Sequence, residues 1–349
     1  MRRSALILIG LGTLLIVIAA LVRFVVAPNA TRLPDDTDST TTYSGTGTFL
    51  NAQALQSGDM ANALARDIPV TLDRHVYVSQ TDGNTAIVHD DGTLKAASTT
   101  AEDKHTYAVD RKELTETSTI SGVEVEKHEG LTITLPVDPE PKSGVYKYWD
   151  TQTLTAVPVT YVGSEERDGR KTYHYRATAT GPLAAPELKQ QLPVVLPKSL
   201  APRLLPLLPA DVQAKLAPVV AGLPDLVELG YTATSTYDVF ADAELGAPLD
   251  IRINRSVVAS VTAGSASIPL LPVLAYDVAQ DKASVSESVG DIKDASRLLG
   301  WISLWIPLAL LVVGLVLIVL GVLRRKPRVT DSSATPSGVA PTTVEPPKA

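Results

Sequence analysis

No cysteine occurs among the 349 residues, so this chain has no disulfide, no thiolate metal ligand and no cysteine nucleophile. Aromatic residues make up only 5% of the chain, and methionine occurs twice. The fold must therefore rest mainly on packing of aliphatic side chains. About 270 residues separate two long apolar runs near the ends of the chain, which is enough for a sizeable core.

The two apolar runs cover residues 5–22 and 298–323, and each is long enough to cross a bilayer, which takes roughly 20 helical residues. We predict membrane-spanning helices at residues 5–27 and 301–323. Trp301 and Trp305 open the second span, where indole rings favour the headgroup layer. The sequence thus predicts a protein of the cell membrane with two spans.

Basic residues flank the outer end of each run: Arg2, Arg3, Arg324 and Arg325. Because positive charge stays on the cytoplasmic side, residues 1–4 and 324–349 are expected in the cytoplasm and residues 28–300 outside it. The cytoplasmic tail is rich in Pro, Ser and Thr, which predicts disorder. We expect Trp301, Trp305, Arg324 and Arg325 at the membrane interface.

A cleaved signal peptide is the alternative interpretation of the first run. Its apolar core of 18 residues is longer than the ~7 to 15 residues usual in a signal peptide. Pro28 also stands where a cut after Ala27 would fall. These features favour a retained span, and in either case the central region lies outside the cytoplasm.

Positive charge is scarce between the runs. Of the 31 basic and 38 acidic residues, eight basic and two acidic ones lie in the flanks, which leaves a central net charge of about −13. An acidic region of this kind lacks the basic patch with which proteins bind nucleic acid. We therefore expect the membrane, an envelope lipid or a protein as partner, and no nucleic acid.

The central region has the pattern of an α+β domain dominated by antiparallel sheet. After a linker at residues 28–45, residues 46–300 contain short runs rich in Val, Thr, Tyr and Ile, which predict short strands. Asp82-Gly83, Asp91-Gly92 and Asp168-Gly169 are dipeptides that favour tight hairpin turns.

Several local elements are predicted more closely. Residues 157–162 and 171–178 alternate on either side of Asp168-Gly169 and predict a hairpin. A turn is expected at residues 244–246. Helices are expected over residues 52–65 and 281–299, the second leading directly into the C-terminal span.

Residues 181–230 form an insert with nine prolines and no aromatic residue. Proline removes an amide donor and restricts the residue before it, so short helices, such as 212–220 and 225–229, are the expected structure. The dense Leu and Val side chains must pack against the core, the bilayer, another chain or a lipophilic ligand. The candidate ligand-binding side chains are Leu192, Val194, Val195, Leu196, Leu204, Leu205, Leu207 and Leu208.

Motifs for catalysis are missing. The sequence has no Gly-x-Ser-x-Gly, Ser-x-x-Lys, His-Glu-x-x-His or Gly-x-x-x-x-Gly-Lys pattern, and its five histidines are scattered. Adjacent carboxylates fall in expected linkers and turns, where they bond to the backbone. We predict a protein that is not an enzyme and has no cofactor and no metal site.

One segment resembles a known family. Residues 130–136, Gly-Leu-Thr-Ile-Thr-Leu-Pro, followed by 146–150, Tyr-Lys-Tyr-Trp-Asp, are similar to a segment of an actinobacterial membrane-protein family of unknown function that includes proteins labelled porin PorA. Residues 109–112, Val-Asp-Arg-Lys, resemble a turn of the same family. The resemblance implies a high-GC Gram-positive envelope and supplies no catalytic residue.

Three interpretations of function remain. The first is an anchored protein whose Pro/Leu insert, residues 181–230, binds or carries a lipophilic envelope component; the second is a scaffold of an envelope complex. The third is a hydrolase or transferase that works from dispersed acidic residues, which the absence of any catalytic motif disfavours. The family label also suggests a porin, but a transmembrane β-barrel needs at least eight strands of ~9 to 11 residues and the expected strands are shorter. A cavity of several hundred Å3 would favour the first interpretation.

Overall fold

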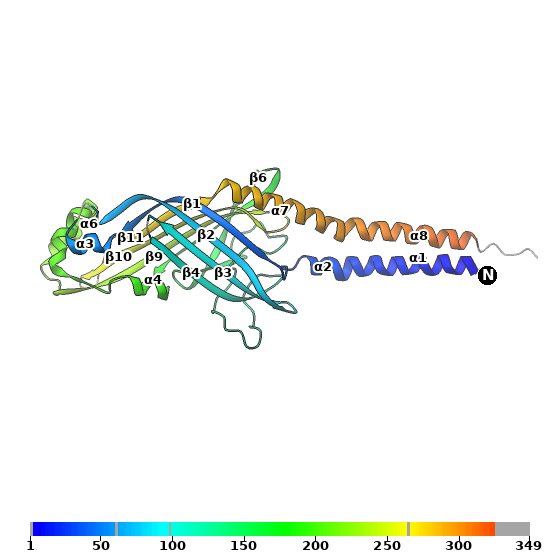
Figure 1. Ribbon diagram of the computed structural model, residues 1–349, viewed down its shortest axis with the longest axis horizontal. Helices are drawn as coiled ribbons and strands as arrows, with labels where there is room; N and C mark the ends of the chain where they lie inside the picture. Colours follow the sequence, from blue (N-terminus) through cyan, green and yellow to red (C-terminus); the bar gives the residue numbers. More distant parts are fainter. Residues whose placement is uncertain (1–2, 60–61, 98, 264–265, 325–349) are drawn as a thin grey trace, which may run out of the picture. The chain divides into compact units, whose positions relative to one another are not determined.

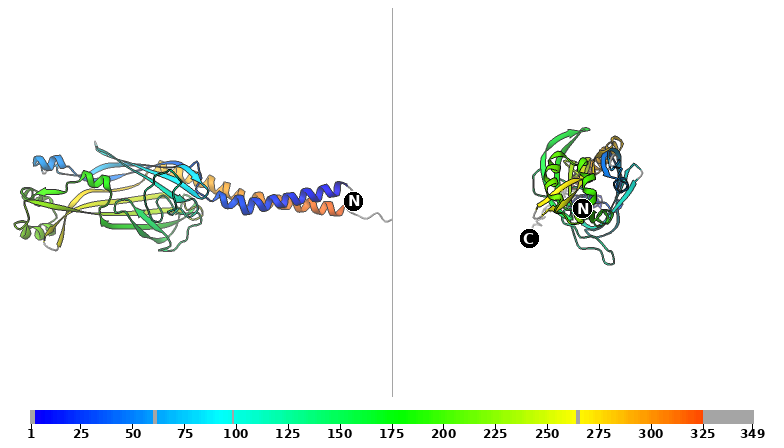
Figure 2. Two further views of the ribbon diagram at one scale, coloured as in Figure 1. Left: turned by 90° about the horizontal axis from the view of Figure 1, so that it is seen from below. Right: turned by 90° about the vertical axis from the view of Figure 1, so that its left-hand side faces the viewer.

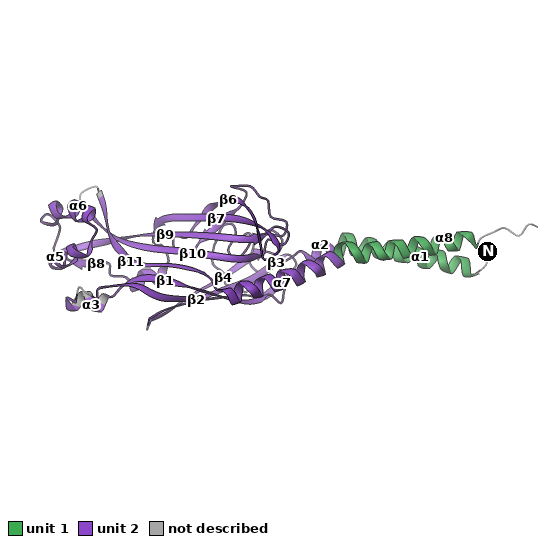
Figure 3. Cartoon of the chain, turned by 90° about the horizontal axis from the view of Figure 1, so that it is seen from above, with its two compact units in different colours: residues 1–26, 302–349 green, residues 27–301 purple. Residues whose placement is uncertain are grey.

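The computed structural model describes residues 3–59, 62–97, 99–263 and 266–324. The chain divides into two compact units, one of Met1–Val26 with Ile302–Ala349 and one of Ala27–Trp301 (Figure 3). Arg325 and the rest of the predicted cytoplasmic tail lie outside the described residues.

Two helical segments are long and apolar enough to cross a membrane, Ser4–Ala30 and Lys282–Leu323. The first comprises α1 (Arg3–Leu21), a π-helical turn η1 (Val22–Val26) and α2 (Ala27–Ala30) (Figure 1). The second comprises α7 (Lys282–Gly300), a π-helical turn η4 (Trp301–Trp305) and α8 (Ile306–Leu323). Each contains one of the two apolar runs of the sequence and extends beyond it.

Within the first unit, α1 and α8 pack through glycines. A Cβ atom added to Gly12 would lie 2.5 Å from the Gly314 carbonyl oxygen, and one added to Gly314 would lie 2.7 Å from the Gly12 oxygen. Small residues allow two backbones this close approach, which van der Waals contact then stabilises in a membrane. Arg23 Nη1 also donates to the Ser303 carbonyl oxygen at 3.1 Å and so links the π-helical turns.

The Gly12 contact gives a first prediction. Gly12→Leu is expected to separate α1 from α8 by about 2 Å, toward the 8–10 Å usual between helix axes, because the new side chain meets the Gly314 backbone. Spin labels on exposed positions, introduced as Leu11→Cys and Leu315→Cys in a chain without native cysteine, measure the separation. Gly10→Leu is the matched control, since nothing lies within 4 Å of its added Cβ. Equal distance distributions in the two variants would contradict the glycine contact.

The second unit is built on an eleven-stranded antiparallel sheet that curls into a half-barrel (Figure 1 and Figure 2). Ten strands follow the order β4-β3-β2-β1-β11-β10-β9-β7-β6-β5, while β8 pairs with β9. The pairing of β1 with β11 joins the first and last strands of the unit. The strands are β1 (Asp38–Leu50), β2 (Leu64–Asp82), β3 (Thr85–Ala96), β4 (Thr99–Asp110), β5 (Lys147–Asp150), β6 (Thr155–Arg167), β7 (Arg170–Pro182), β8 (Val195–Pro197), β9 (Leu226–Asp242), β10 (Pro248–Ala263) and β11 (Ala266–Gln280).

Most strands are longer than the sequence indicated. Nine of them have 12 to 19 residues, whereas short strands were predicted. The strands run long because each pairs along most of its length with at least one neighbouring strand, and this pairing outweighs the weak alternation in the sequence. The argument from strand length against a barrel therefore does not hold for this chain.

The turn signals have mixed outcomes. The hairpin at Asp168-Gly169 is confirmed, with φ angles of 49° and 75° that suit a two-residue turn between β6 and β7. Gly83 has φ 56° and lies in the turn between β2 and β3. The prediction of a turn at Asp91-Gly92 is wrong, because both residues lie inside β3 and pair with β2 and β4. The turn at residues 244–246 joins β9 and β10 as expected.

Other element boundaries shift. β1 begins at Asp38, inside the predicted linker of residues 28–45. The first internal helix, α3 (Ala52–Ser57), is shorter than predicted because β2 already begins at Leu64. The insert contains short helices as expected, but residues 226–229 of the predicted helix 225–229 belong to β9. Its helices are α4 (Pro186–Gln191), η2 (Lys198–Leu200), α5 (Ala201–Leu204), η3 (Leu205–Leu207) and α6 (Ala210–Val220).

The connection between β4 and β5, residues 111–146, bridges the two edges of the half-barrel. Next to β4, Glu126 N donates to Thr106 O at 2.8 Å. Next to β5, Leu131 N donates to Lys147 O at 2.8 Å, and Trp149 N donates to Leu131 O at 2.9 Å. Edge strands otherwise expose unpaired amides, so this connection both satisfies the edges and encloses the space between them.

Helix α7 is fixed against the sheet. Asp281 caps its N-terminus by accepting from Ser284 N at 2.7 Å, which confirms the helix predicted over 281–299. Val289 and Ile292 pack on Leu249 of β10. The helical segment Lys282–Leu323 therefore begins with a helix that packs in the core of the second unit.

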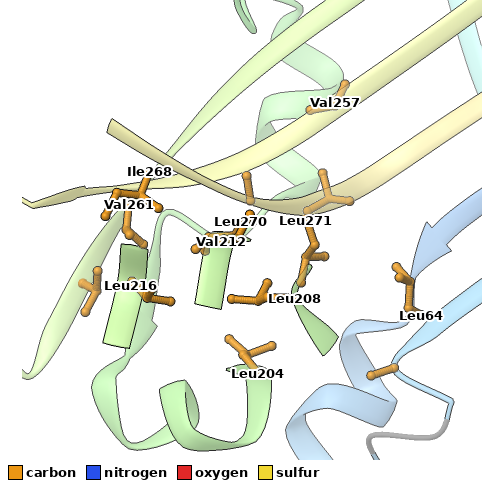
Figure 4. Packing of buried hydrophobic residues seen from close by; sticks show 14 of the residues in the cluster. Leu64, Leu204, Leu208, Val212, Leu216, Val257, Val261, Ile268, Leu270 and Leu271 are labelled. Atoms are coloured by element: carbon orange, nitrogen blue, oxygen red, sulfur yellow. The ribbon is translucent and has the colours of Figure 1, made fainter. Parts of the chain in front are cut away.

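The Pro/Leu insert covers the ends of β9, β10 and β11 (Figure 4). Leu204, Leu208 and Leu216 are buried against Val261 and Leu271. This packing gives the dense aliphatic run of the insert a place in the domain's own core, which was one of the four contacts considered from sequence.

Candidate functional site

A cavity of about 170 Å3 lies within the half-barrel of the second unit. Its wall is mostly apolar and includes side chains from nine strands, among them Leu72, Val159, Ile253 and Leu274. An engineered protein cavity of 150 Å3 holds benzene. The cavity therefore has room for one end of a larger molecule rather than for an entire lipid.

The strand period positions these side chains. Alternate residues of a strand share a face, so Ile251, Ile253 and Arg255 of β10 all point into the cavity. The same period brings Asp103, His105 and Tyr107 of β4 into its wall. These three residues form an Asp-x-His-x-Tyr pattern in the sequence. Their side chains point toward β10 only because the sheet is curled.

The cavity opens between the start of β4 and helix α4. Three of its lining residues are exposed, Glu102 of β4 and Glu187 and Gln191 of α4, whereas the others are buried or half-buried. Two carboxylates therefore stand at the opening. Helix α4 is the part of the Pro/Leu insert that reaches this site.

The first arginine of the cavity forms a bidentate ion pair. Arg74 donates to both carboxylate oxygens of Asp90, from Nε at 2.7 Å and from Nη2 at 2.6 Å. Nη2 also donates to the Thr132 carbonyl oxygen at 3.1 Å. Both side chains of the pair are only about 15% exposed and therefore lose most of their contact with water. The two parallel hydrogen bonds compensate for this loss.

The second arginine is paired loosely. Arg255 Nη2 donates to the Tyr237 hydroxyl at 3.0 Å, while Nη1 lies 3.7 Å from Asp103 Oδ2. Tyr237 in turn donates to Asp150, which is completely buried. Arg255 Nε is buried and has no hydrogen-bond partner among the described residues.

A charged histidine lies beside this arginine. His105 forms ion pairs of 2.9 Å with Asp103 and with Glu126. Burial alone would lower the pKa of His105, but the two carboxylates outweigh that effect and raise the pKa to about 10. The imidazole is therefore protonated at neutral pH and adds a positive charge to the wall.

Several buried polar atoms of the wall lack hydrogen-bond partners among the described residues. Besides Arg255 Nε, they include the Tyr107 hydroxyl, Trp149 Nε1 and Thr132 Oγ1. Burial raises the pKa of Tyr107, so its hydroxyl keeps the proton and remains a donor. In native proteins nearly all buried polar atoms have a hydrogen-bond partner. Several atoms without one at the same cavity therefore indicate that a ligand or water binds there.

The ligand-binding residues predicted from sequence line a different region. Leu204 and Leu208 are buried in the core of the insert, and Val194 is 71% exposed. A second cavity there measures about 30 Å3, the share of one water molecule in the liquid. None of the predicted side chains lines the larger cavity; besides Leu204, Leu208 and Val194, they are Leu192, Val195, Leu196, Leu205 and Leu207.

The aromatic segment at residues 146–150, which carries the family resemblance, reaches the cavity. The structure places Tyr148 and Trp149 in the cavity wall. Of the predicted interface residues, Trp301 and Trp305 are exposed in η4, and Arg324 follows α8. Within the described part of the chain, no group of three His, Asp or Glu side chains has the geometry to hold a metal ion.

The family model described as Porin PorA matches residues 4–323, which include both candidate spans and the whole sheet. The chain belongs to the Porin PorA family. A protein named Porin PorA from Corynebacterium resistens is 41% identical to this PorA-family chain over 63 residues. The aligned stretch covers 18% of this chain and 15% of that relative.

The match confirms the family that the Tyr-Lys-Tyr-Trp-Asp segment suggested. The two apolar helices and the family point to a membrane protein, and the name points to a channel or structural protein rather than to an enzyme.

Proposed function

We propose that this PorA-family protein is a membrane-anchored binding protein without enzymatic activity, which takes one end of a lipophilic envelope molecule into the half-barrel cavity. The spans at residues 5–27 and 301–323 hold the protein in the membrane, with residues 28–300 outside the cytoplasm and both termini inside. The charge asymmetry of Arg2, Arg3 and Arg324 supports that orientation.

The apolar cavity is the observation that supports binding most directly. Its walls include Leu72, Val159, Ile251 and Leu274, and each Å2 of apolar surface removed from water contributes about 25 cal/mol. The opening beside α4 gives a ligand a route to this surface. At 170 Å3 the cavity suits a head and the adjoining carbons, while the remaining chain stays outside.

A pair of neighbouring residues on β7 tests this function. Ala177 lines the cavity, whereas Thr178 points to the exposed face of the same strand. Ala177→Phe is expected to fill the cavity and remove a bound lipid, while Thr178→Phe retains it. Mass spectrometry of lipids purified with the full chain measures the difference, because lipids held by the spans are common to both variants.

A defined lipid present in the wild type and in Thr178→Phe, and at least about tenfold reduced in Ala177→Phe, is the expected result. Circular dichroism of each variant verifies the fold, and Val239→Trp fills the same cavity from β9 should Ala177→Phe not fold. Identical lipid content in a folded cavity-filling variant and in Thr178→Phe would contradict the proposal.

A pore is the second candidate, and the family description favours it. The strands of 12 to 19 residues also satisfy the ~9 to 11 residues that a transmembrane strand needs. Against it, Tyr107, Tyr175 and Arg74 fill the interior of the half-barrel with packed side chains. Conductance of the purified full chain in planar bilayers, with Ala177→Phe as the blocked variant, distinguishes a pore from a binding site.

A further inference from the structure

We infer that the molecule taken by this cavity is an uncharged amphiphile whose head presents acceptor oxygens, an acyl ester, to the unpaired donors Arg255 Nε, Tyr107 Oη and Trp149 Nε1. The inference rests on the proposed function and names the chemistry of its ligand.

Donors predominate among the unpaired atoms. Arg255 Nε and Trp149 Nε1 can only donate, and the Tyr107 hydroxyl can also donate. Each lacks a partner among the described residues, although burial without a hydrogen bond is costly. Ester and carbonyl oxygens accept hydrogen bonds and do not donate them, so they can pair with these donors. A hydrocarbon would leave every one of these donors unpaired.

Arg74 provides the contrast within the same cavity. Its guanidinium donates three hydrogen bonds, two to the carboxylate of Asp90 and one to the Thr132 carbonyl oxygen. Arg255 Nη2 donates to the hydroxyls of Tyr237 and Thr151, and Nη1 lies 3.7 Å from Asp103. Its Nε has no hydrogen-bond partner among the described residues. Of the two buried arginines, Arg255 on β10 therefore has an N–H group that can still donate to a ligand.

The charge of the wall argues against an anionic head. Arg74, Arg255 and protonated His105 supply three positive charges. Four carboxylates line the same cavity, and two of them stand at its opening. They are Asp90, Glu102, Asp103 and Glu187. Each of the three positive charges already has a carboxylate partner, so a carboxylate or phosphate would meet no unpaired cation that compensates its loss of water, whereas a neutral ester loses less on leaving water.

Three probes with similar chains separate these chemistries. Methyl oleate carries neutral acceptor oxygens, oleate carries a charged head, and 1-octadecene carries no oxygen. Each competes with a diazirine-bearing methyl ester for photolabelling of the full chain in lipid nanodiscs, and peptide mass spectrometry locates the label. We expect methyl oleate to compete at least about tenfold better than either of the others at pH 7.5.

Tyr107→Phe tests the donors without disturbing the packing. Because the hydroxyl has no partner among the described residues, its removal should leave thermal stability unchanged or slightly raised, which a purely structural role also predicts. Competition by methyl oleate should nevertheless weaken about five- to tenfold, while that by 1-octadecene stays the same. Tyr77→Phe, on β2 and outside the cavity wall, is the matched control.

Arg255→Gln should weaken competition by methyl oleate to a similar extent. Arg176→Gln, at an exposed arginine, is its control. Equal affinity of Tyr107→Phe, Arg255→Gln and wild type for methyl oleate would overturn the inference, as would tighter competition by oleate. In those cases loss of labelling in Ala177→Phe would leave the binding function standing. If Ala177→Phe labels like the wild type with every probe, the proposed function fails as well.

Discussion

Asp242→Ala is expected to lower the free energy of unfolding by about 3 to 5 kcal/mol, the cost of breaking a buried ion pair by removing one partner. The Asp242 side chain is 1% exposed and accepts from Arg170 Nε at 2.7 Å and Nη2 at 2.8 Å. It also accepts from the backbone amides of Glu244 and Leu245 in the turn between β9 and β10. Burial alone would raise the pKa of Asp242, but these hydrogen bonds lower it below its ordinary value.

The same cluster holds helix α7. Arg170 Nη1 donates to Ser296 Oγ at 3.3 Å, and Ser296 donates to Glu244 at 2.7 Å. Loss of Asp242 leaves a mostly buried guanidinium without its main partner and loosens the contact of α7 with the sheet. Denaturant titration of the full chain measures the change.

The control for Asp242 lies on α7. Asp294 pairs with Arg297 at 3.2 Å, but both side chains are more than 70% exposed. Exposed pairs contribute about 0 to 1 kcal/mol, so Asp294→Ala should have little effect. A similar loss of stability in Asp242→Ala and Asp294→Ala would mean that burial does not set the strength of the Arg170 pair.

Raising the pH from 6.5 to 10 is expected to destabilise the second unit by about 3 kcal/mol through His105. The folded-state pKa of about 10 lies above the ordinary histidine value of 6.5, because Asp103 and Glu126 outweigh the effect of burial. A raised pKa contributes stability that is fully present below pH 6.5 and is lost as the pH rises through 10. Unfolding free energies measured across this range give the slope.

His105→Gln should flatten that slope, even though it also lowers the overall stability by leaving Asp103 and Glu126 without the imidazolium. His75→Gln removes a histidine that pairs with exposed Asp38 and is itself 40% exposed, so the slope should remain. A slope in His105→Gln equal to that of the wild type would show that the three-residue ion pair does not persist in the folded protein.

Local signals in the sequence predicted several elements correctly. Asp168-Gly169 gave the hairpin of β6 and β7 because its two residues readily adopt positive φ. Asp281 gave the start of α7 because its carboxylate satisfies a free amide. Both structures depend on interactions within a few residues. The same kind of signal failed at Asp91-Gly92, where ladders with β2 and β4 hold an extended strand.

The cavity could not be predicted from local sequence patterns. Arg255 and Asp103 are 152 positions apart, and they meet because the sheet curls and residues 111–146 bridge its edges. Leu204 and Leu208 attracted attention by their density, yet they pack in the core of the insert. An apolar side chain has the same pattern in sequence whether another side chain or a ligand covers it.

The sequence by itself determined the two apolar helices, the antiparallel character of the domain and membership of the family, since hydropathy, turn chemistry and short motifs are properties of neighbouring residues. Only the tertiary structure decided which polar side chains are left without partners. Arg74 and Arg255 are alike in the sequence, but Arg74 pairs with Asp90 of the neighbouring strand whereas Arg255 of β10 lies 3.7 Å from Asp103 of β4, which is not its neighbour in the sheet. Pairing across a curled sheet depends on distances that no single segment encodes.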